Sequence, residues 1–302
     1  MTKTRSPSPP SAGPGAAAPV ASPIAPCPAG CPGSVTFHQL GGKWGWDDFT
    51  DPAVPWMSIQ NGKSDTALAK AVTNGARMCN VTYESSNTAA VTVSPARGTS
   101  DNQTLTLTGT GVGEATITAK CGGAAIGTFK VVSYNLVTKT VAVRLVNETG
   151  YASTDVGDAV IRAYLKKVYD QGVVSFVVTR LPAKTVAFDH NGDSKVDVNS
   201  WMSAEMATIR NTCKDDTYNY NIFLVNKSSD NSAGFMSFNN PYGFVHPDTG
   251  TARKTIAHEL GHGAFGLSHT DAAPDLDLDN IMYSDYSDTK WKLRKAQWDA
   301  MH

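Results

Sequence analysis

The chain has 302 residues and a formal net charge of −1, a length that predicts two domains and a tail rather than one domain. Lys and Arg are scattered along the sequence instead of forming a stripe, which argues against a nucleic-acid-binding surface. No run of about 18 apolar residues occurs, so we expect no membrane-spanning helix.

Residues 1–34 are rich in Pro, Ala, Ser and Gly, a composition that buries too little apolar surface to fold, and we expect a disordered tail. Its prolines interrupt the apolar core that a signal peptide needs. The protein is therefore expected to leave the cell by a route without a cleavable signal or, alternatively, to stay in the cytoplasm. Cys27 and Cys31 bracket a short turn that forms a small loop, a zinc half-site or nothing functional, which is the preferred interpretation.

Residues 35–56 read as an aromatic linker containing Trp44, Trp46, Phe49 and Trp56 beside three aspartates. Aromatic residues at this density form a carbohydrate or partner surface, or they pack the linker onto the neighbouring domain. We prefer the second interpretation.

Residues 57–135 alternate apolar and polar side chains in short runs separated by Gly, Asn and Ser. This pattern predicts an antiparallel β-sandwich, and the runs VTYESSNTAAVTVSPA and GTGVGEATITAKCGG resemble bacterial Ig-like domains. In such a sandwich Cys79 and Cys121 lie on neighbouring strands, where they form a disulfide or remain two reduced thiols. Cys213, further along the chain on an apolar helical stripe, is expected to be a core residue.

From residue 136 to residue 302 the periodicity changes to strand, helix, strand. We expect strands at 141–145, 173–178 and 221–225, and helices at 154–172, 201–212 and 292–301. The Gly- and Phe-rich segment 233–245 is expected to be an exposed edge strand that precedes the helix carrying the motif described below.

The loop 189–197, DHNGDSKVD, carries oxygen ligands at positions one, three, five and nine, and resembles the calcium loop of EF-hands and dockerins. These ligands are Asp189, Asn191, Asp193 and Asp197. Ser194 stands where the turn glycine belongs, and Ser200 replaces the acid at position twelve. A plain Asn-Gly turn is the preferred interpretation, with Ca²⁺ binding as the alternative.

His258 and His262 occupy the HExxH spacing, with Glu259 between them and His269 seven residues further on. On a helix, positions i and i+4 share one face, so two imidazoles point to one centre with the carboxylate beside it. Two or three histidines that leave a fourth position for water are typical of catalytic zinc. The motif is short, however, and it also occurs by chance on solvated helix faces.

The motif, followed by Gly266, His269 and Met282, resembles the metzincin clan of zinc metallopeptidases, whose signature HExxHxxGxxH precedes a turn bearing methionine. Here Gly266 lies four positions after His262 instead of three, and one extra residue rotates the helix exit by about 100°. The third ligand is accordingly His269 or one of four aspartates, namely Asp271, Asp275, Asp277 and Asp279. HELGHGAFGLSHT and NIMYSDYSDTKWKLRKAQWD also look like bacterial metzincin-like domains of large surface or toxin-type proteins.

The resemblance implies an α+β fold in which a metzincin-like peptidase domain, a mixed sheet with an active-site helix, follows an all-β Ig-like sandwich. It also implies that the edge strand binds an extended peptide, that Met282 forms an apolar floor under the imidazoles, and that Tyr283 or Tyr286 stabilises the oxyanion. Neither tyrosine lies two residues after the methionine, so packing is an equal alternative for both. Zn²⁺ activates water, and Glu259 is its general base.

The sequence therefore predicts a zinc-dependent endopeptidase acting on a protein or peptide. Bacterial-looking modules without a signal peptide favour a secreted effector or toxin, with a secretion-machine component and a cognate inhibitor as partners. One alternative is an adhesive or binding protein whose zinc site is structural or degenerate, which the inserted residue after His262 favours. Another is an intracellular processing protease with reduced cysteines.

Overall fold

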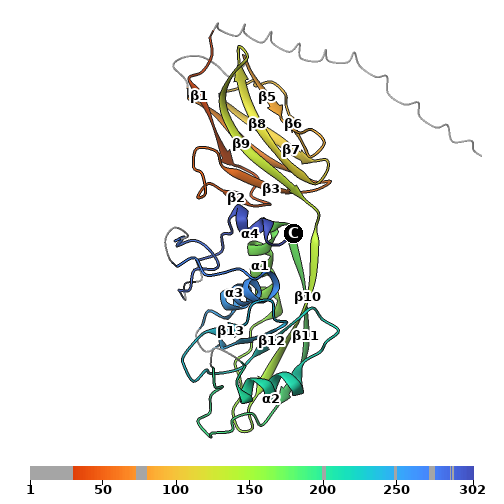
Figure 1. Cartoon of the computed structure of the whole chain (residues 1–302), viewed down its shortest axis with the longest axis vertical. Coiled ribbons are helices and arrows are strands. Elements are labelled where there is room, and N and C mark those ends of the chain that lie inside the picture. Colours follow the sequence, from red (N-terminus) through yellow and green to blue (C-terminus); the bar gives the residue numbers. More distant parts are fainter. Residues whose placement is uncertain are drawn as a thin grey trace, which may run out of the picture.

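The computed structural model describes residues 30–72, 80–198, 202–247, 250–271, 276–285, 287 and 289–302. These residues form an elongated molecule with a β-sandwich at one end and a sheet flanked by helices at the other (Figure 1). We call residues 30–134 the sandwich and residues 137–302 the C-terminal part. The predicted tail, apart from its last residues, lies outside the described residues.

The sandwich consists of two sheets with strand orders β1-β4-β7-β6 and β2-β3-β9-β8-β5. Its strands are β1 (Ser34–Gln39), β2 (Trp46–Asp47), β3 (Trp56–Gln60), β4 (Ser64–Val72), β5 (Val81–Ser85), β6 (Val91–Ser94), β7 (Asn102–Gly109), β8 (Gly113–Cys121) and β9 (Ala124–Tyr134). Along β7 buried and exposed residues alternate, so that Leu105 and Leu107 face the core between the sheets. The predicted alternation therefore corresponds to the inner and outer faces of the sandwich.

Two expectations for the sandwich are corrected. The segment predicted as a linker contains β1 and β2, and Trp44 within it is 6% exposed, because its apolar side chains complete the core of the sandwich. Cys121 forms a disulfide with Cys31 and not with Cys79, because the chain before β1 passes beside the end of β8. Cys79 itself lies outside the described residues.

The C-terminal part contains a five-stranded sheet of order β11-β10-β12-β14-β13, parallel except for β13. Its strands are β10 (Val137–Asn147), β11 (Val174–Thr185), β12 (Tyr220–Leu224), β13 (Gly234–Met236) and β14 (Tyr242–Val245). The helices are α1 (Asp158–Tyr169), the 3-10 helix η2 (Asp170–Gly172), α2 (Ala204–Cys213), α3 (Ala252–Phe265) and α4 (Lys295–Asp299).

Helices cover both faces of this sheet. Along β12, Ile222 and Leu224 belong to the core shared with α1 and α3, whereas Phe223 belongs to a second core with residues of α2 (Figure 1). A strand buried on both faces reads as a continuous apolar run, which explains why the sequence of this strand shows no alternation. Cys213 of α2 is a buried free thiol, as predicted.

The predicted α+β class with a metzincin-like domain is wrong, because strand residues outnumber helix residues in the described chain as a whole. The strands β9, β10 and β11 each span 11 or 12 residues. The last helix, α4, has 5 residues, whereas ten were expected. The strands extend beyond their apolar centres, and the helices are shorter than their apolar stripes. The share of residues in strands is therefore larger than the sequence predicted.

The two parts meet around α4, at a junction that the sequence did not indicate (Figure 1). Trp298 is fully buried there, and a Cβ on Gly45 of the sandwich would lie 2.4 Å from its Cζ2 atom. Ser58 Oγ of β3 donates to the carbonyl of Gln171 at 2.5 Å. One continuous cluster of buried apolar residues runs through both parts, so the sandwich and the C-terminal part share a core.

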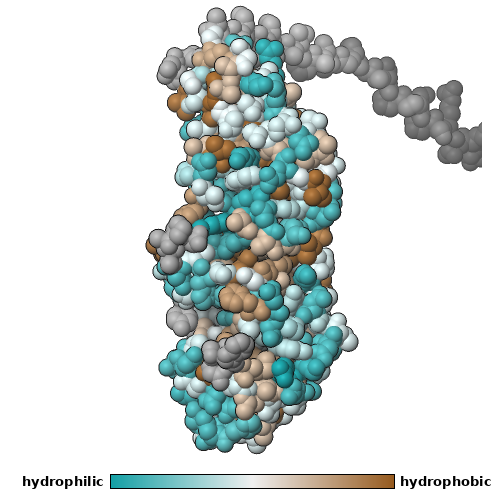
Figure 2. Space-filling model, viewed as in Figure 1, coloured by the Kyte–Doolittle hydropathy of each residue, from teal (hydrophilic) through white to brown (hydrophobic). Residues whose placement is uncertain are grey.

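The visible surface is mainly hydrophilic, with separate tan and brown patches over both parts (Figure 2). Within the described ranges no helix has the length and apolar character needed to cross a bilayer. The prediction that no helix spans a membrane is confirmed for that portion of the chain.

Candidate metal centre

Helix α3 carries the HExxH motif at the bottom of a cavity. His258, Glu259 and His262 are 6 to 7% exposed. The helix ends at Gly266, whose φ of +62° is a left-handed conformation that glycine adopts without strain. Its N–H donates to the carbonyl of His262, and the next N–H, from Leu267, donates to the carbonyl of Gly261. This cap turns the chain back toward the helix and brings His269 to the motif.

The three imidazoles converge on one point. The Nε2 atoms of His258, His262 and His269 lie 3.0 to 3.1 Å from one another. A tetrahedral zinc ion with bonds of about 2.0–2.1 Å separates its ligands by about 3.3 Å. The three nitrogens are therefore spaced as the ligands of a single small cation, and they form the metal-compatible group of the described residues.

Hydrogen bonds to carbonyls fix the tautomers of two of these rings. His258 Nδ1 lies 2.8 Å from the carbonyl oxygen of Ile281, and His262 Nδ1 lies 2.6 Å from that of Leu267. Because a carbonyl only accepts, each Nδ1 carries the proton and each Nε2 presents a lone pair. Two lone pairs facing each other at 3.1 Å repel unless a cation lies between them.

Burial shifts the pKa values of the histidines and the glutamate of the motif. It holds the pKa of His258 well below its usual range and lowers that of His262 to about 4, so both rings are neutral at pH 7. Burial also raises the pKa of Glu259 to about 8, against the opposing charge of Lys254 and a hydrogen bond from the Met236 backbone. A cation at the three nitrogens favours the carboxylate of Glu259 and so counteracts the effect of burial.

A cavity of about 650 Å³ opens over the motif. It is lined by His258, Glu259, His262 and His269, by residues 232–238 around β13, and by Lys254, Thr255 and Ser284. Strand β13 is the edge of its sheet, pairing with β14 alone. At Gly234 in this strand a Cβ would lie 2.9 Å from Glu259 Oε1, so only glycine leaves the carboxylate its place.

Met282 packs against the motif helix. It is fully buried, and a Cβ on Gly261 would lie 2.5 Å from its Sδ atom, so this glycine lets the methionine reach α3. The same turn supplies the Ile281 carbonyl that orients His258. The role of Met282 as an apolar floor under the imidazoles stays a prediction.

Lys254 was missed by the sequence analysis. It is 4% exposed, lines the cavity, and donates from Nζ to the carbonyls of Tyr283 at 3.0 Å and Asp285 at 2.6 Å. It precedes His258 by four residues, the helical spacing that places two side chains on one face, so the same rule that joins the two motif histidines could have identified it.

Three of the four alternative third ligands have other partners in the structure. Asp277 Oδ2 pairs with Arg294 at 3.0 Å, and Asp279 pairs with Lys292 at 3.5 Å. Asp271 accepts from the backbone N–H of Ser284, and its Oδ2 lies 3.8 Å from His269 Nδ1, which places it behind the ring. Asp275 lies outside the described residues.

The predicted oxyanion tyrosines gain no support. Tyr283 is absent from the described lining of the cavity, and Lys290 Nζ lies 5.5 Å from the centre of its ring. Tyr286 lies outside the described residues.

The predicted calcium loop has the hydrogen bonds of a compact turn. Asp189 accepts from the N–H groups of Gly192, Asp193 and Ser194, and Ser194 has a φ of +64°. Asn191 accepts from the N–H of Asp193, and the N–H of Asp197 donates to Glu205. Ser200 lies outside the described residues. Calcium binding stays a prediction.

No family model and no curated protein matches the chain. Among solved structures, it is similar to domains 4 and 5 of the S-layer protein SbsC, with 25% identity over 26% of this chain and 46% of that one and a TM-score of 0.22. It is also similar to the D0-D1 domain of intimin, with 20% identity over 29% of this chain and 53% of that one and a TM-score of 0.22.

The chain thus spans about half of each of these structures, and at such TM-scores the likeness carries no inference about function. The identification of the chain as a metzincin-like peptidase is wrong.

Proposed function

We propose that the protein is a zinc-dependent peptide hydrolase in which His258, His262 and His269 hold the ion and Glu259 is the general base. The observation that carries the proposal is the convergence of three Nε2 atoms at 3.0 to 3.1 Å, two of them with lone pairs fixed toward the centre. Such a set of neutral nitrogen donors suits zinc. Because the centre opens to a cavity of about 650 Å³, a fourth position is accessible to a reactant.

The bound metal and Glu259 would have different roles in the proposed reaction. Zinc, when bound, supplies a Lewis acid that polarises a carbonyl and lowers the pKa of water to about 7. Glu259, which follows the first ligand on α3 and faces the same cavity, takes the proton of the attacking water and returns it to the leaving amine. The N–H of Met236 and the absence of a side chain at Gly234 keep this carboxylate in place.

The proposed substrate is an extended peptide. Strand β13 borders the cavity and has no partner strand on its outer side within the described chain, so its backbone can pair with a substrate strand. Phe238, 56% exposed, lies edge-on to His262 with 5.1 Å between ring centres. An apolar side chain of the substrate has a contact surface there.

The proposed location is outside the cytoplasm. The disulfide between Cys31 and Cys121 supports it, because such bonds persist in oxidising compartments. Mass spectrometry of protein from its native location, with and without reduction, tests this. A free thiol at Cys31 would contradict the proposed location and favour the cytoplasm. A secretion machine and a cognate inhibitor stay predictions.

Elemental analysis combined with peptide-library cleavage tests the proposed activity. We expect one zinc per chain in the wild type, cleavage of peptides, and loss of both on His258→Ala. His38→Ala removes an exposed histidine outside the site and should retain both. Bound zinc without cleavage of any peptide or protein would contradict a hydrolase and favour a binding protein with a structural zinc.

A further inference from the structure

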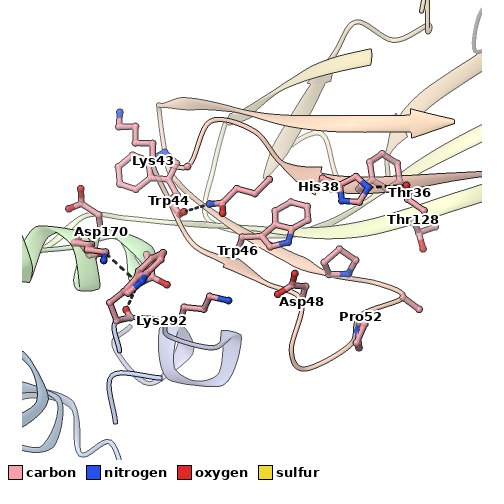
Figure 3. Close-up of a pocket in the computed structure, with 18 of the residues that line it drawn as sticks. Thr36, His38, Lys43, Trp44, Trp46, Asp48, Pro52, Thr128, Asp170 and Lys292 are labelled. Carbon is pink, nitrogen blue, oxygen red and sulfur yellow. Dashed lines mark hydrogen bonds between the residues drawn. The ribbon is translucent and has the colours of Figure 1, made fainter. Parts of the chain in front are cut away.

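A second and larger cavity lies away from the histidines. It is a groove of about 1080 Å³ between the sandwich and the C-terminal part (Figure 3). One wall is formed by β1 and residues 42–55, and the other by α1, η2 and residues 291–292. The groove shares no lining residue with the cavity over the motif, so occupation of one leaves the other open.

The walls of the groove are held in fixed positions. Gln171 of η2, 5% exposed, donates from Nε2 to the Trp291 carbonyl at 2.8 Å, and its backbone carbonyl accepts from Ser58 Oγ of the sandwich. One buried residue therefore holds Trp291 and connects the C-terminal part to the sandwich. A preformed groove requires little ordering when a ligand binds.

Indole rings line the groove. Trp46 lies in it beside Asp48, as Figure 3 shows, and is backed by Phe129 with 6.0 Å between ring centres. Trp291 lines the opposite wall. Trp44 is 6% exposed and belongs to the core behind this wall.

The charges of the groove are predominantly positive. The lining contains four lysines, namely Lys43, Lys166, Lys167 and Lys292, but two acids, Asp48 and Asp170. Lys166 pairs with Asp170. The lining thus attracts anions, although the whole chain carries a net charge of −1.

Polar side chains also line the groove, on one side of Trp46 (Figure 3). Thr36 and His38 lie side by side, with 3.0 Å between Oγ1 and Nε2, and Thr128 lies close to them (Figure 3). Gln39 donates from its amide to the Trp44 carbonyl at 3.1 Å. A flat aromatic ring can pack against the apolar face of a sugar ring. The nearby hydroxyl, imidazole and amide groups can form hydrogen bonds with the sugar hydroxyls.

An extended peptide fits this groove less well. β1 pairs with β4, and on its other side β9 approaches so closely that a Cβ on Gly127 would lie 2.1 Å from the Val35 carbonyl oxygen. A peptide strand adding to β1 would collide with β9 at this point. The groove therefore offers side chains to a ligand, and not a free strand edge.

We propose that this groove binds an acidic polysaccharide, with a sugar ring against Trp46 and carboxylates beside the lysines. The site lies apart from the histidines, so it holds the protein on a glycan-coated surface while the cavity over the motif stays accessible. The proposal does not depend on the hydrolase activity.

Titration calorimetry and tryptophan fluorescence on the full chain test the proposal. The probes are carboxylated polysaccharides (polygalacturonate, alginate and hyaluronate), neutral dextran and galactan, and poly-glutamate as an acidic peptide. We expect the wild type to bind at least one carboxylated polysaccharide more tightly than any neutral probe or poly-glutamate. Binding should weaken as salt rises from about 0.05 to about 0.5 M, because the screening length of exposed charges shortens to a few ångströms over this range.

Two variants assign the binding to the groove. Lys43→Glu/Lys166→Glu reverses two exposed charges and should weaken binding about tenfold or more, whereas Lys63→Glu, an exposed lysine outside the groove, should leave it unchanged. Trp46→Ala should also weaken binding. Peptide cleavage should be equal in all of them. Binding of no carboxylated polysaccharide, equal binding of poly-glutamate, or undiminished binding by the double lysine variant would overturn the proposal.

Discussion

Two regions of the described chain hold buried polar side chains in opposite arrangements. At the junction around α4, Lys295 is 7% exposed and donates from Nζ to Glu114 at 2.8 Å and to Asp299 at 2.6 Å. Asn280 and Gln297 exchange two amide hydrogen bonds, at 2.8 and 3.1 Å. Every one of these groups has its partner within the protein.

The metal centre lacks this mutual pairing. The second nitrogens of His258 and His262 are satisfied by carbonyls, but their Nε2 atoms present lone pairs to one another. Buried polar groups that satisfy each other stabilise a fold, whereas groups that converge without satisfying each other need an additional ligand. The first arrangement should affect stability when altered, and the second should affect binding and catalysis.

The largest expected effect on catalysis is that of Glu259→Gln. Loss of the general base should lower kcat by about 10²- to 10⁴-fold, while the zinc content stays at the wild-type value. In the metal-free protein burial raises the pKa of Glu259 to about 8, so the ionised form is disfavoured in the folded state, and the metal-free glutamine variant should be at least as stable at pH 7 as the metal-free wild type. Steady-state kinetics and thermal unfolding measure both. A variant that unfolds at lower temperature would show that Glu259 is structural.

At the junction the largest expected effect is that of Trp298→Ala. This side chain is fully buried against Gly45, and its removal should cost about 3–5 kcal/mol of unfolding free energy. Because the two parts share a core, they should unfold in one transition in the wild type. Tyr151→Ala, at a side chain 53% exposed, should change stability by less than about 0.5 kcal/mol. Two separate transitions in wild-type calorimetry would show that the parts fold independently.

Local patterns predicted the elements better than their assembly. The apolar stripe of α1, the run of β12 and the motif helix α3 follow from spacing within about a dozen residues. The pairing of Cys31 with Cys121 across 90 residues depends on the register of distant strands. The burial of Trp44 depends on contacts with the sandwich core, which no local pattern contains.

The third ligand shows the same limit within the site. The i, i+4 spacing predicted His258 and His262 as metal ligands. The direction of the chain after the helix could not be predicted, so His269 and four aspartates stayed candidates for the third ligand. The cap at Gly266, which brings His269 to the motif, and the pairing of Asp277 with Arg294 favour His269. Both depend on contacts between residues in three dimensions. The unusual spacing of Gly266 was the one feature of the sequence that pointed to this helix exit.

Gly266→Ala tests whether this cap positions the third ligand. Alanine at a φ of +62° should cost about 1 kcal/mol of stability and weaken zinc binding about tenfold by displacing His269. Gly62→Ala is the matched control, because Gly62 has a φ of +76° in open space within the sandwich. It should lose similar stability but no zinc affinity, as measured by competition with a chromophoric chelator. Equal zinc affinity in both variants would mean that the cap does not position His269.

The smallest expected effect is that of Phe238→Ala, which distinguishes an aromatic residue that contacts substrate from one that packs. The side chain is 56% exposed at the mouth of the cavity, so its removal should change the unfolding free energy by less than about 0.5 kcal/mol. If a substrate side chain packs on this ring, KM for peptides with an aromatic residue near the scissile bond should rise about two- to tenfold, because an aromatic contact contributes about 0.5–1.5 kcal/mol. KM for peptides with small residues there should stay constant, and Tyr151→Ala should change neither value. A loss of stability without a change in KM would place Phe238 with Trp298, as a residue of the fold and not of the site.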